Sequence, residues 1–199
     1  MPLLTVTKII SGGQVGADRA GLDFAIKHSI PHGGWCPKYR IAQDGLVPMK
    51  YQLQEAEKHG YWHRTKLNVR DSDATVVFTP PTPGRGSSMT IQSCLDFGRP
   101  YLHITTEQSL DEAAARLLKF ITERKVKTLN VAGSRKPDLY QFTLLVLQLA
   151  LSPSQPKIPP TCPTPITAPI RNIHVPVNKS TRRRGWSLYP KPAKTLMDN

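Results

Sequence analysis

The feature that most constrains the fold is a short apolar, β-branched run followed by a helical pattern, and this unit occurs four times before residue 152. The runs that predict strands cover residues 6–10, 74–79, 101–104 and 128–132. Each run gives way to a loop and then to apolar residues at the helical period. Repeated strand–loop–helix units favour parallel strands, because each helix carries the chain back across the sheet. The sequence therefore predicts an α/β fold, with a parallel sheet and helices on both faces.

The predicted helices carry local signals of their own. Ser109 and Glu112 form a capping box ahead of an apolar stripe, and Pro137 suits the first turn of a helix that runs to about Leu151. Residues 30–65 fit the pattern least, and we expect a short strand, a long loop and a turn of helix there. The helical period also predicts several inward-facing side chains, among them Ile26, Leu95 and Leu118.

The composition changes after Leu151, where the apolar periodicity stops. Residues 152–199 hold ten of the 19 prolines and seven of the 13 net positive charges. Such a segment cannot offset its ordering entropy by burial, so we expect a disordered C-terminal tail. The chain thus divides into a folded domain, residues 1–151, and a basic tail, residues 152–199. Because the domain is only mildly basic, contact with nucleic acid is expected only through the tail.

The sequence also argues against two classes of protein. The longest apolar run, residues 144–151, is far shorter than the roughly 18 residues of a membrane span. No basic segment, apolar stretch and cleavage site open the chain, so we expect no secretory leader. Cys36, Cys94 and Cys162 form no C-x-x-C pair, which is typical of a reducing compartment rather than a disulfide scaffold. We therefore expect a cytoplasmic protein without a membrane partner.

Three of the predicted strands end in loops that contain glycine. Residues 11–16 read Ser-Gly-Gly-Gln-Val-Gly, residues 84–88 read Gly-Arg-Gly-Ser-Ser, and residues 133–135 read Gly-Ser-Arg. Glycine lets a backbone approach a phosphate closely, and the N–H groups of a first helical turn point toward it. The alternative is a tight turn that needs glycine for its geometry alone. Three such loops at one edge of a sheet favour a binding site there, and we expect the first loop to lie at the surface.

Several segments together resemble one protein family. They are residues 10–14 (Ile-Ser-Gly-Gly-Gln), 31–38 (Pro-His-Gly-Gly-Trp-Cys-Pro-Lys), 68–75 (Asn-Val-Arg-Asp-Ser-Asp-Ala-Thr) and 130–133 (Asn-Val-Ala-Gly). These motifs are similar to those of proteins called molybdenum carriers, a circularly permuted YpsA-like branch of the SLOG superfamily. The resemblance implies a Rossmann-like fold, a nucleotide-like ligand that bears a phosphate, molybdenum cofactor (molybdopterin) as a carried ligand, and assembly as a homo-oligomer.

The residues predicted to bind the ligand lie in these loops and motifs. They are Gly12, Gly13, Gln14, Gly16, Asp18, Arg19, Lys38, Asp44, Asn68, Arg70, Asp71, Gly84, Gly86, Ser87, Ser88, Gly133 and Arg135. The carboxylates also have ordinary structural roles, in a first helical turn or an Asx turn. Val15 stands where the family has threonine, and Ser134 replaces a proline, which puts the family's ligand affinity in doubt for this chain.

The sequence predicts no metal site, and it leaves open whether any residue is catalytic. His32 and Cys36 are four residues apart, but the glycines between them disfavour a helix, and no third ligand is placed. If the protein carries a molybdenum cofactor, we therefore expect it to bind the phosphate group of the pterin. Trp35 and Tyr39 are candidates to stack on a planar ring, although burial in a core is equally ordinary for Trp35.

We interpret the sequence as that of a cytoplasmic binding protein for a nucleotide-like ligand that bears a phosphate, and two alternatives stay open. One is a nucleoside 5′-monophosphate phosphoribohydrolase, because residues 83–87 resemble the start of the corresponding loop in that class. The glutamate of that loop is missing, and Asp96 lies too far along the helix to replace it. The other is a single-stranded nucleic-acid-binding module, which the basic tail and some superfamily relatives suggest.

Overall fold

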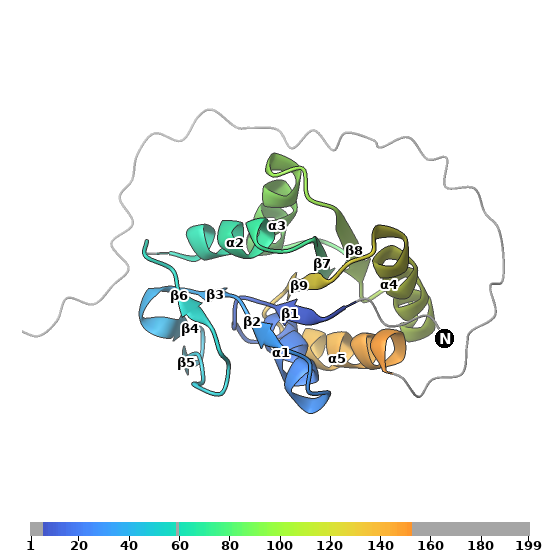
Figure 1. Ribbon diagram of the computed structural model, residues 1–199, viewed down its shortest axis with the longest axis horizontal. Coiled ribbons are helices and arrows are strands. Elements are labelled where there is room, and N and C mark those ends of the chain that lie inside the picture. Colours follow the sequence, from blue (N-terminus) through green and yellow to red (C-terminus); the bar gives the residue numbers. More distant parts are fainter. Residues whose placement is uncertain (1–5, 59, 153–199) are drawn as a thin grey trace, which may run out of the picture. The chain divides into compact units, whose positions relative to one another are not determined.

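The computed structural model describes residues 6–58 and 60–152. Within them, the main sheet has five parallel strands in the order β2-β1-β9-β7-β8 (Figure 1). The strands are β1 (Lys8–Ile10), β2 (His32–Gly33), β7 (Ala74–Thr79), β8 (Tyr101–Thr105) and β9 (Thr128–Gly133). The four strands expected from the repeated pattern are confirmed, and β2 is the short strand expected between residues 30 and 65. The predicted tail, except for Ser152, lies outside the described residues.

Helices cover both faces of the sheet. On one face, α1 (Ala17–Lys27) and α4 (Leu110–Arg124) each pack against α5 (Pro137–Leu151). On the other face, α2 (Tyr61–Arg70) packs against α3 (Arg85–Asp96) (Figure 1). This arrangement confirms the predicted α/β fold. No helix in the part of the chain that the structure describes is long and apolar enough to cross a membrane.

The main core lies between the central strands and the helices. Every residue of β7 is buried, as expected for an inner parallel strand covered on both faces. Phe78 of β7 and Leu117 of α4 belong to this core and are fully buried. One half of the capping box predicted for α4 is confirmed, because the Ser109 hydroxyl accepts a hydrogen bond from the backbone N–H of Glu112 at 3.2 Å. The Glu112 carboxylate accepts from the side-chain amide of Gln108, also at 3.2 Å.

Three apolar side chains predicted to face inward are exposed instead. Ile26, Leu95 and Leu118 keep 41%, 58% and 44% of their surfaces exposed. Each lies one position beyond the buried stripe of its helix, where smaller residues such as Ala25 and Ala114 make the contact with the core. The buried stripe is therefore narrower than the helical period alone predicted.

Residues 34–56, which we call the accessory segment, follow β2. In this segment β3 (Trp35–Cys36) pairs with β6 (Gln54–Glu55), and β4 (Ile41–Ala42) pairs with β5 (Gly45–Leu46). A short 3-10 turn, η1 (Lys38–Arg40), connects the two pairs. The sequence predicted only a long loop here. The accessory segment has a small core of its own, which contains Cys36, Ala42, Val47, Tyr51 and Leu53 and includes Leu22 of α1.

Arg40 organises the accessory segment from within. Its guanidinium donates hydrogen bonds to the carbonyl oxygens of Val47, Pro48, Tyr51 and Leu53, at 3.1, 3.0, 3.0 and 3.1 Å. A single planar fork thus satisfies four carbonyl groups of one irregular stretch, a geometry that a lysine ammonium cannot reproduce.

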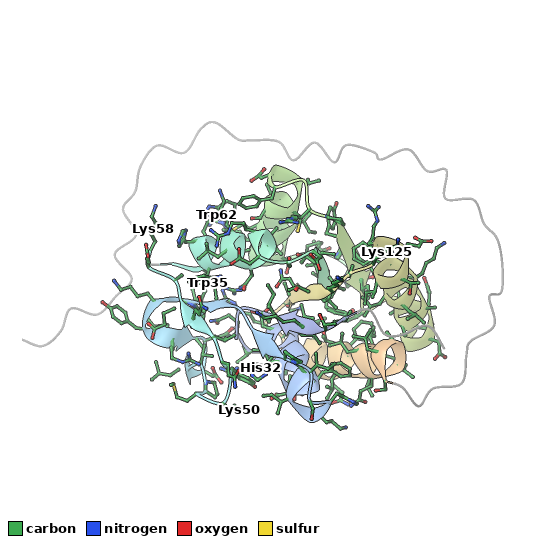
Figure 2. The ribbon with its side chains drawn as sticks, viewed as in Figure 1. His32, Trp35, Lys50, Lys58, Trp62 and Lys125 are labelled. Atoms are coloured by element: carbon green, nitrogen blue, oxygen red, sulfur yellow. The ribbon has the colours of Figure 1, made fainter. Side chains whose placement is uncertain are left out.

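We expect Arg40→Lys to lower the free energy of unfolding by about 2 kcal/mol, because several of these carbonyls lose a charged donor. Urea denaturation of the two proteins measures the difference. Lys58→Ala is the matched control, since Lys58 is exposed, points away from the domain (Figure 2) and has no hydrogen bond or ion pair among the described residues. A variant Arg40→Lys as stable as the parent protein would contradict this role.

Candidate functional site

The candidate site lies at the carboxyl edge of the sheet, between two neighbouring strands. β7 and β9 pair side by side, but α3 leaves β7 toward one face and α5 leaves β9 toward the other. The loops after these two strands therefore diverge. In open parallel sheets, ligands bind at the carboxyl ends of strands where the connections part in this way.

A hollow with a volume of about 470 Å³ occupies this position. It is lined by Pro80, Pro81, Thr82, Pro83 and Gly84 of the loop after β7, and by Ser134 and Lys136 of the loop after β9. The prolines make one wall rigid, since each fixes its own backbone. The second and third glycine-containing loops of the sequence thus face one space, as predicted from their positions at strand ends.

The N-terminus of α3 opens beside this hollow. Gly84 is its N-cap residue, and no side chain caps the helix. An added Cβ at Gly84 or Gly86 would meet no atom within 4 Å, so the backbone of this first turn is accessible. Ser87 and Ser88 follow in the same turn, and the Ser88 hydroxyl donates to the Gly84 carbonyl at 3.3 Å. An uncapped first turn carries unpaired N–H groups and a partial positive charge, which favours an anion.

Three cationic residues of the two loops form no ion pair among the described residues, although the charge of Arg135 acts on the Asp18 carboxyl. Arg85, Arg135 and Lys136 make no ion pair and no hydrogen bond through their side chains to any of the described residues. Some other cations of the domain are paired, such as Arg19, whose guanidinium lies 2.6 Å from the Asp44 carboxylate. The rim of the hollow therefore has an unbalanced positive charge.

The first loop is buried, which contradicts the expectation that it lies at the surface. Gly12 and Gly13 are both covered. An added Cβ on Gly12 would overlap the guanidinium of Arg64. Gly13 has φ of +74°, and its Cβ would lie 2.6 Å from Leu53 and 2.8 Å from Val47 of the accessory segment. Internal packing thus accounts for both glycines.

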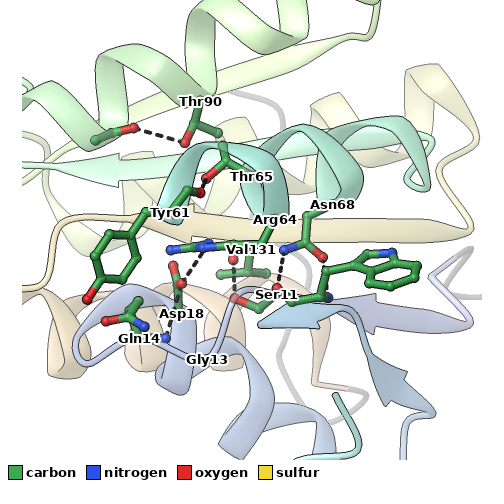
Figure 3. A network of polar contacts seen from close by, with 12 residues as sticks. Ser11, Gly13, Gln14, Asp18, Tyr61, Arg64, Thr65, Asn68, Thr90 and Val131 are labelled. Atoms are coloured by element: carbon green, nitrogen blue, oxygen red, sulfur yellow. Dashed lines mark hydrogen bonds and ion pairs between the residues drawn. The ribbon is translucent and has the colours of Figure 1, made fainter. Parts of the chain in front are cut away.

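Asp18 fills the place where an anion would meet the first loop. Its carboxylate is 3% exposed, accepts a hydrogen bond from the backbone N–H of Gln14 at 3.3 Å, and lies 3.3 Å from the guanidinium of Arg64 (Figure 3). Burial raises the pKa of the Asp18 carboxyl, and the positive charges of Arg64 and Arg135 oppose that shift. The buried charge of each partner is compensated by the other.

Two polar atoms near this ion pair have no partner among the residues described. The Gln14 amide nitrogen donates to the Ile41 carbonyl at 3.0 Å, which leaves the buried amide oxygen Oε1 without a donor. The Nε–H of Arg64 is also buried and lacks an acceptor. Buried polar atoms without partners are uncommon, and a bound water or ligand group is their usual complement.

The other predicted site residues bind one another away from the hollow. The Asn68 side chain holds both the N–H and the carbonyl of Trp35, at 2.8 and 3.0 Å. Asp71 accepts hydrogen bonds from the guanidinium of Arg70 at 2.6 Å and from the indole of Trp35 at 2.7 Å (Trp35 is labelled in Figure 2). Arg70 holds the pKa of the Asp71 carboxyl below its usual range. Lys38 lies over the Tyr39 ring in the accessory segment.

The structure therefore sorts the predicted residues into two groups. Gly84 lines the hollow, and the predicted residues near a lining residue along the chain are Gly86, Ser87, Ser88, Gly133 and Arg135. Those whose described contacts lie within the protein are Gly12, Gly13, Gln14, Gly16, Asp18, Arg19, Lys38, Asp44, Asn68, Arg70 and Asp71.

Two residues were not predicted as site residues: Lys136, which lines the hollow, and Tyr61, whose ring centroid lies 4.3 Å from the guanidinium carbon of Arg135. Tyr61 begins α2, and the sequence reasoning placed only a turn of helix before residue 65. Lys136 follows directly after the last strand–loop motif, so its position beside a strand end was the one available signal.

Replacing Asp18 tests its part in the first loop. We expect Asp18→Ala to lower the free energy of unfolding by about 3 kcal/mol, because Arg64 is left as an unpaired buried charge. Formate should partly restore the melting temperature of this variant, since it can occupy the vacated carboxylate position. Asp44→Ala is the control, because the Asp44 carboxylate is exposed, and formate should bring its melting temperature no gain beyond that of the parent. Equal formate responses in both variants would contradict the assignment.

Comparison with known proteins assigns the family. The circularly permutated YpsA SLOG family matches residues 9–150. A crystal structure of a "Putative molybdenum carrier protein" from Syntrophus aciditrophicus SB is similar, with 44% sequence identity, a TM-score of 0.73, and coverage of 74% of this chain and 96% of that one. Among curated proteins there is no match. With a match that spans the whole sheet and the loops of the hollow, this chain belongs to the circularly permuted YpsA family of SLOG proteins.

Proposed function

We propose that this protein binds a small nucleotide-like ligand, and that the phosphate of the ligand occupies the hollow at the N-terminus of α3. The observation that carries the proposal is the set of unpaired cations, Arg85, Arg135 and Lys136, around an uncapped helix. A phosphate supplies the negative charge and the acceptor oxygens that such a place lacks. Its size also suits a hollow of about 470 Å³, with room for a sugar beside it.

The predicted site residues take different parts in this proposal. The backbone N–H groups of Gly84 and Gly86 and the hydroxyl of the exposed Ser88 are the donors to the phosphate oxygens, whereas Ser87 is buried. Gly133 lets β9 approach β7 closely, because an added Cβ would overlap the Phe78 carbonyl. In this proposal the first loop does not bind the phosphate, because the Asp18 carboxylate already occupies the place of an anion there. The loop contributes by holding the neighbouring backbone in position.

Molybdenum cofactor is one ligand of this chemical class. The similar protein from Syntrophus aciditrophicus SB is named for molybdenum, and the cofactor consists of a pterin with a phosphate. Among the described residues, no group of three or more His, Cys, Asp or Glu side chains is placed to hold a metal ion. We therefore propose that a carried cofactor is held by its phosphate rather than through protein ligands on the metal.

Binding suits this site better than hydrolysis. None of the residues that line the hollow has a carboxyl group. Cleavage of an N-glycosidic bond needs an acid or a base within hydrogen-bond reach of the reacting atoms. We accordingly propose a carrier or sensor of the ligand, and incubation with AMP should release no adenine.

Calorimetric titration with ribose 5-phosphate tests the phosphate site directly. We expect Arg85→Ala and Lys136→Ala each to weaken binding roughly tenfold, the effect of one lost charged contact. Lys127→Ala removes the same charge at the opposite end of β9, where it precedes Thr128, and should leave the affinity unchanged. Equal losses of affinity in all three variants would show that only the net charge of the protein matters. Unchanged affinity in Arg85→Ala and Lys136→Ala would refute the site.

A further inference from the structure

The side chain of Arg135 lies over an aromatic ring, and its positive charge also acts on the buried Asp18 carboxyl. Its guanidinium carbon lies 4.3 Å from the centroid of the Tyr61 ring. Within residues 6–58 and 60–152, the guanidinium donates no hydrogen bond and forms no ion pair. A cation over a ring face is attracted by the ring quadrupole, and guanidinium in particular stacks flat on aromatic faces.

The Arg135–Tyr61 pair lies beside the hollow, although neither of the two side chains lines it. Arg135 lies between Ser134 and Lys136, both of which line the hollow. Tyr61 is the first residue of α2, and α2 runs from the carboxyl edge of the sheet toward the start of β7 at Ala74. The ring therefore lies at the same edge as the N-terminus of α3.

The backbone on both sides of the pair is fixed by hydrogen bonds. Ser134 donates its N–H to the Phe78 carbonyl at 2.8 Å, and its own carbonyl accepts from the Ala17 N–H at 3.2 Å. On the other side, the Thr65 hydroxyl donates to the Tyr61 carbonyl at 2.9 Å (Figure 3). Arg64, next to Tyr61, is tied to Asp18. The pair is thus formed in advance rather than assembled by a ligand.

We propose that Arg135 and Tyr61 form a shelf on which the planar heterocycle of the ligand stacks, a purine or a pterin, while the phosphate binds at α3. This inference rests on the proposed function and specifies the ring that the ligand carries. Tyr61 lies against the Arg135 guanidinium on one side, and in this proposal the heterocycle of the ligand stacks on the other side. Guanidinium planes are established stacking partners of nucleobases, because they are weakly hydrated and polarisable.

The variant Arg135→Lys separates the effect of the flat guanidinium surface from the effect of its positive charge. The ammonium group keeps the positive charge that attracts a phosphate, but it has no plane on which a ring can stack. Tyr61→Phe keeps the aromatic face beneath residue 135 and serves as the matched control. Both changes are conservative in size, and thermal unfolding verifies that each variant keeps the parent's melting temperature.

The experiment compares ribose 5-phosphate with AMP and GMP by calorimetric titration of the full chain. For the parent protein we expect the nucleotides to bind roughly tenfold more tightly than ribose 5-phosphate, the usual range for one stacked base. Arg135→Lys should abolish this advantage while the affinity for ribose 5-phosphate changes less than about threefold. Tyr61→Phe should retain the advantage. GMP carries the amino-oxo pyrimidine ring that a pterin shares, so a preference for GMP over AMP favours a ring with that edge, a guanine or a pterin, over an adenine.

The outcomes distinguish the shelf from the phosphate site. Binding of ribose 5-phosphate without a nucleotide advantage, or an advantage that survives Arg135→Lys, overturns the shelf and leaves the proposed function standing. Failure of ribose 5-phosphate, AMP and GMP alike overturns both. Loss of the advantage in Arg135→Lys together with its retention in Tyr61→Phe supports both.

Discussion

The buried ion pair between Asp18 and Arg64 is the interaction on which the arrangement of the site depends. It connects the first turn of α1 on one face of the sheet to α2 on the other, across the glycine-rich loop. Two charges with so little exposure are tolerated only as a pair, so the two helices must take positions that bring them together. The same requirement explains the glycine at position 12, because the Arg64 guanidinium occupies the space that a side chain there would need.

The same ion pair explains why two similar loops have different uses. A helix N-terminus favours one anion, and in the first loop that anion is the protein's own carboxylate. The loop before α3 has no acidic residue in its first turn and no capping side chain. Its partial charge is therefore available to a ligand. The glycines of the first loop serve packing against Arg64 and the accessory segment, whereas those of the second leave the backbone open.

The sequence predicted the elements that depend on apolar periodicity and missed those that do not, namely helix α2 and the short strands of the accessory segment. The strand at residues 74–79 was predicted to the residue, because all of its side chains are buried and β-branched residues dominate it. Helix α2 was missed since its buried residues are Arg64, Thr65, Asn68 and Val69, three of them polar. A pattern of apolar and polar residues cannot reveal a helix that is held by an ion pair and an amide. Nor does periodicity show that β1 pairs with β9, more than a hundred residues away.

The pairing of β1 with β9 brings together the loops that follow these two strands, which come from opposite ends of the domain. The carbonyl of Ser134, after β9, accepts the N–H of Ala17 after β1, and an added Cβ on Gly16 would overlap that carbonyl. Because φ of Gly16 is +82°, a conformation that favours glycine, the approach depends on this residue. The path of the chain into Arg135 is therefore set by the first loop. That loop shapes the site through the backbone it supports, even where its own side chains are turned inward.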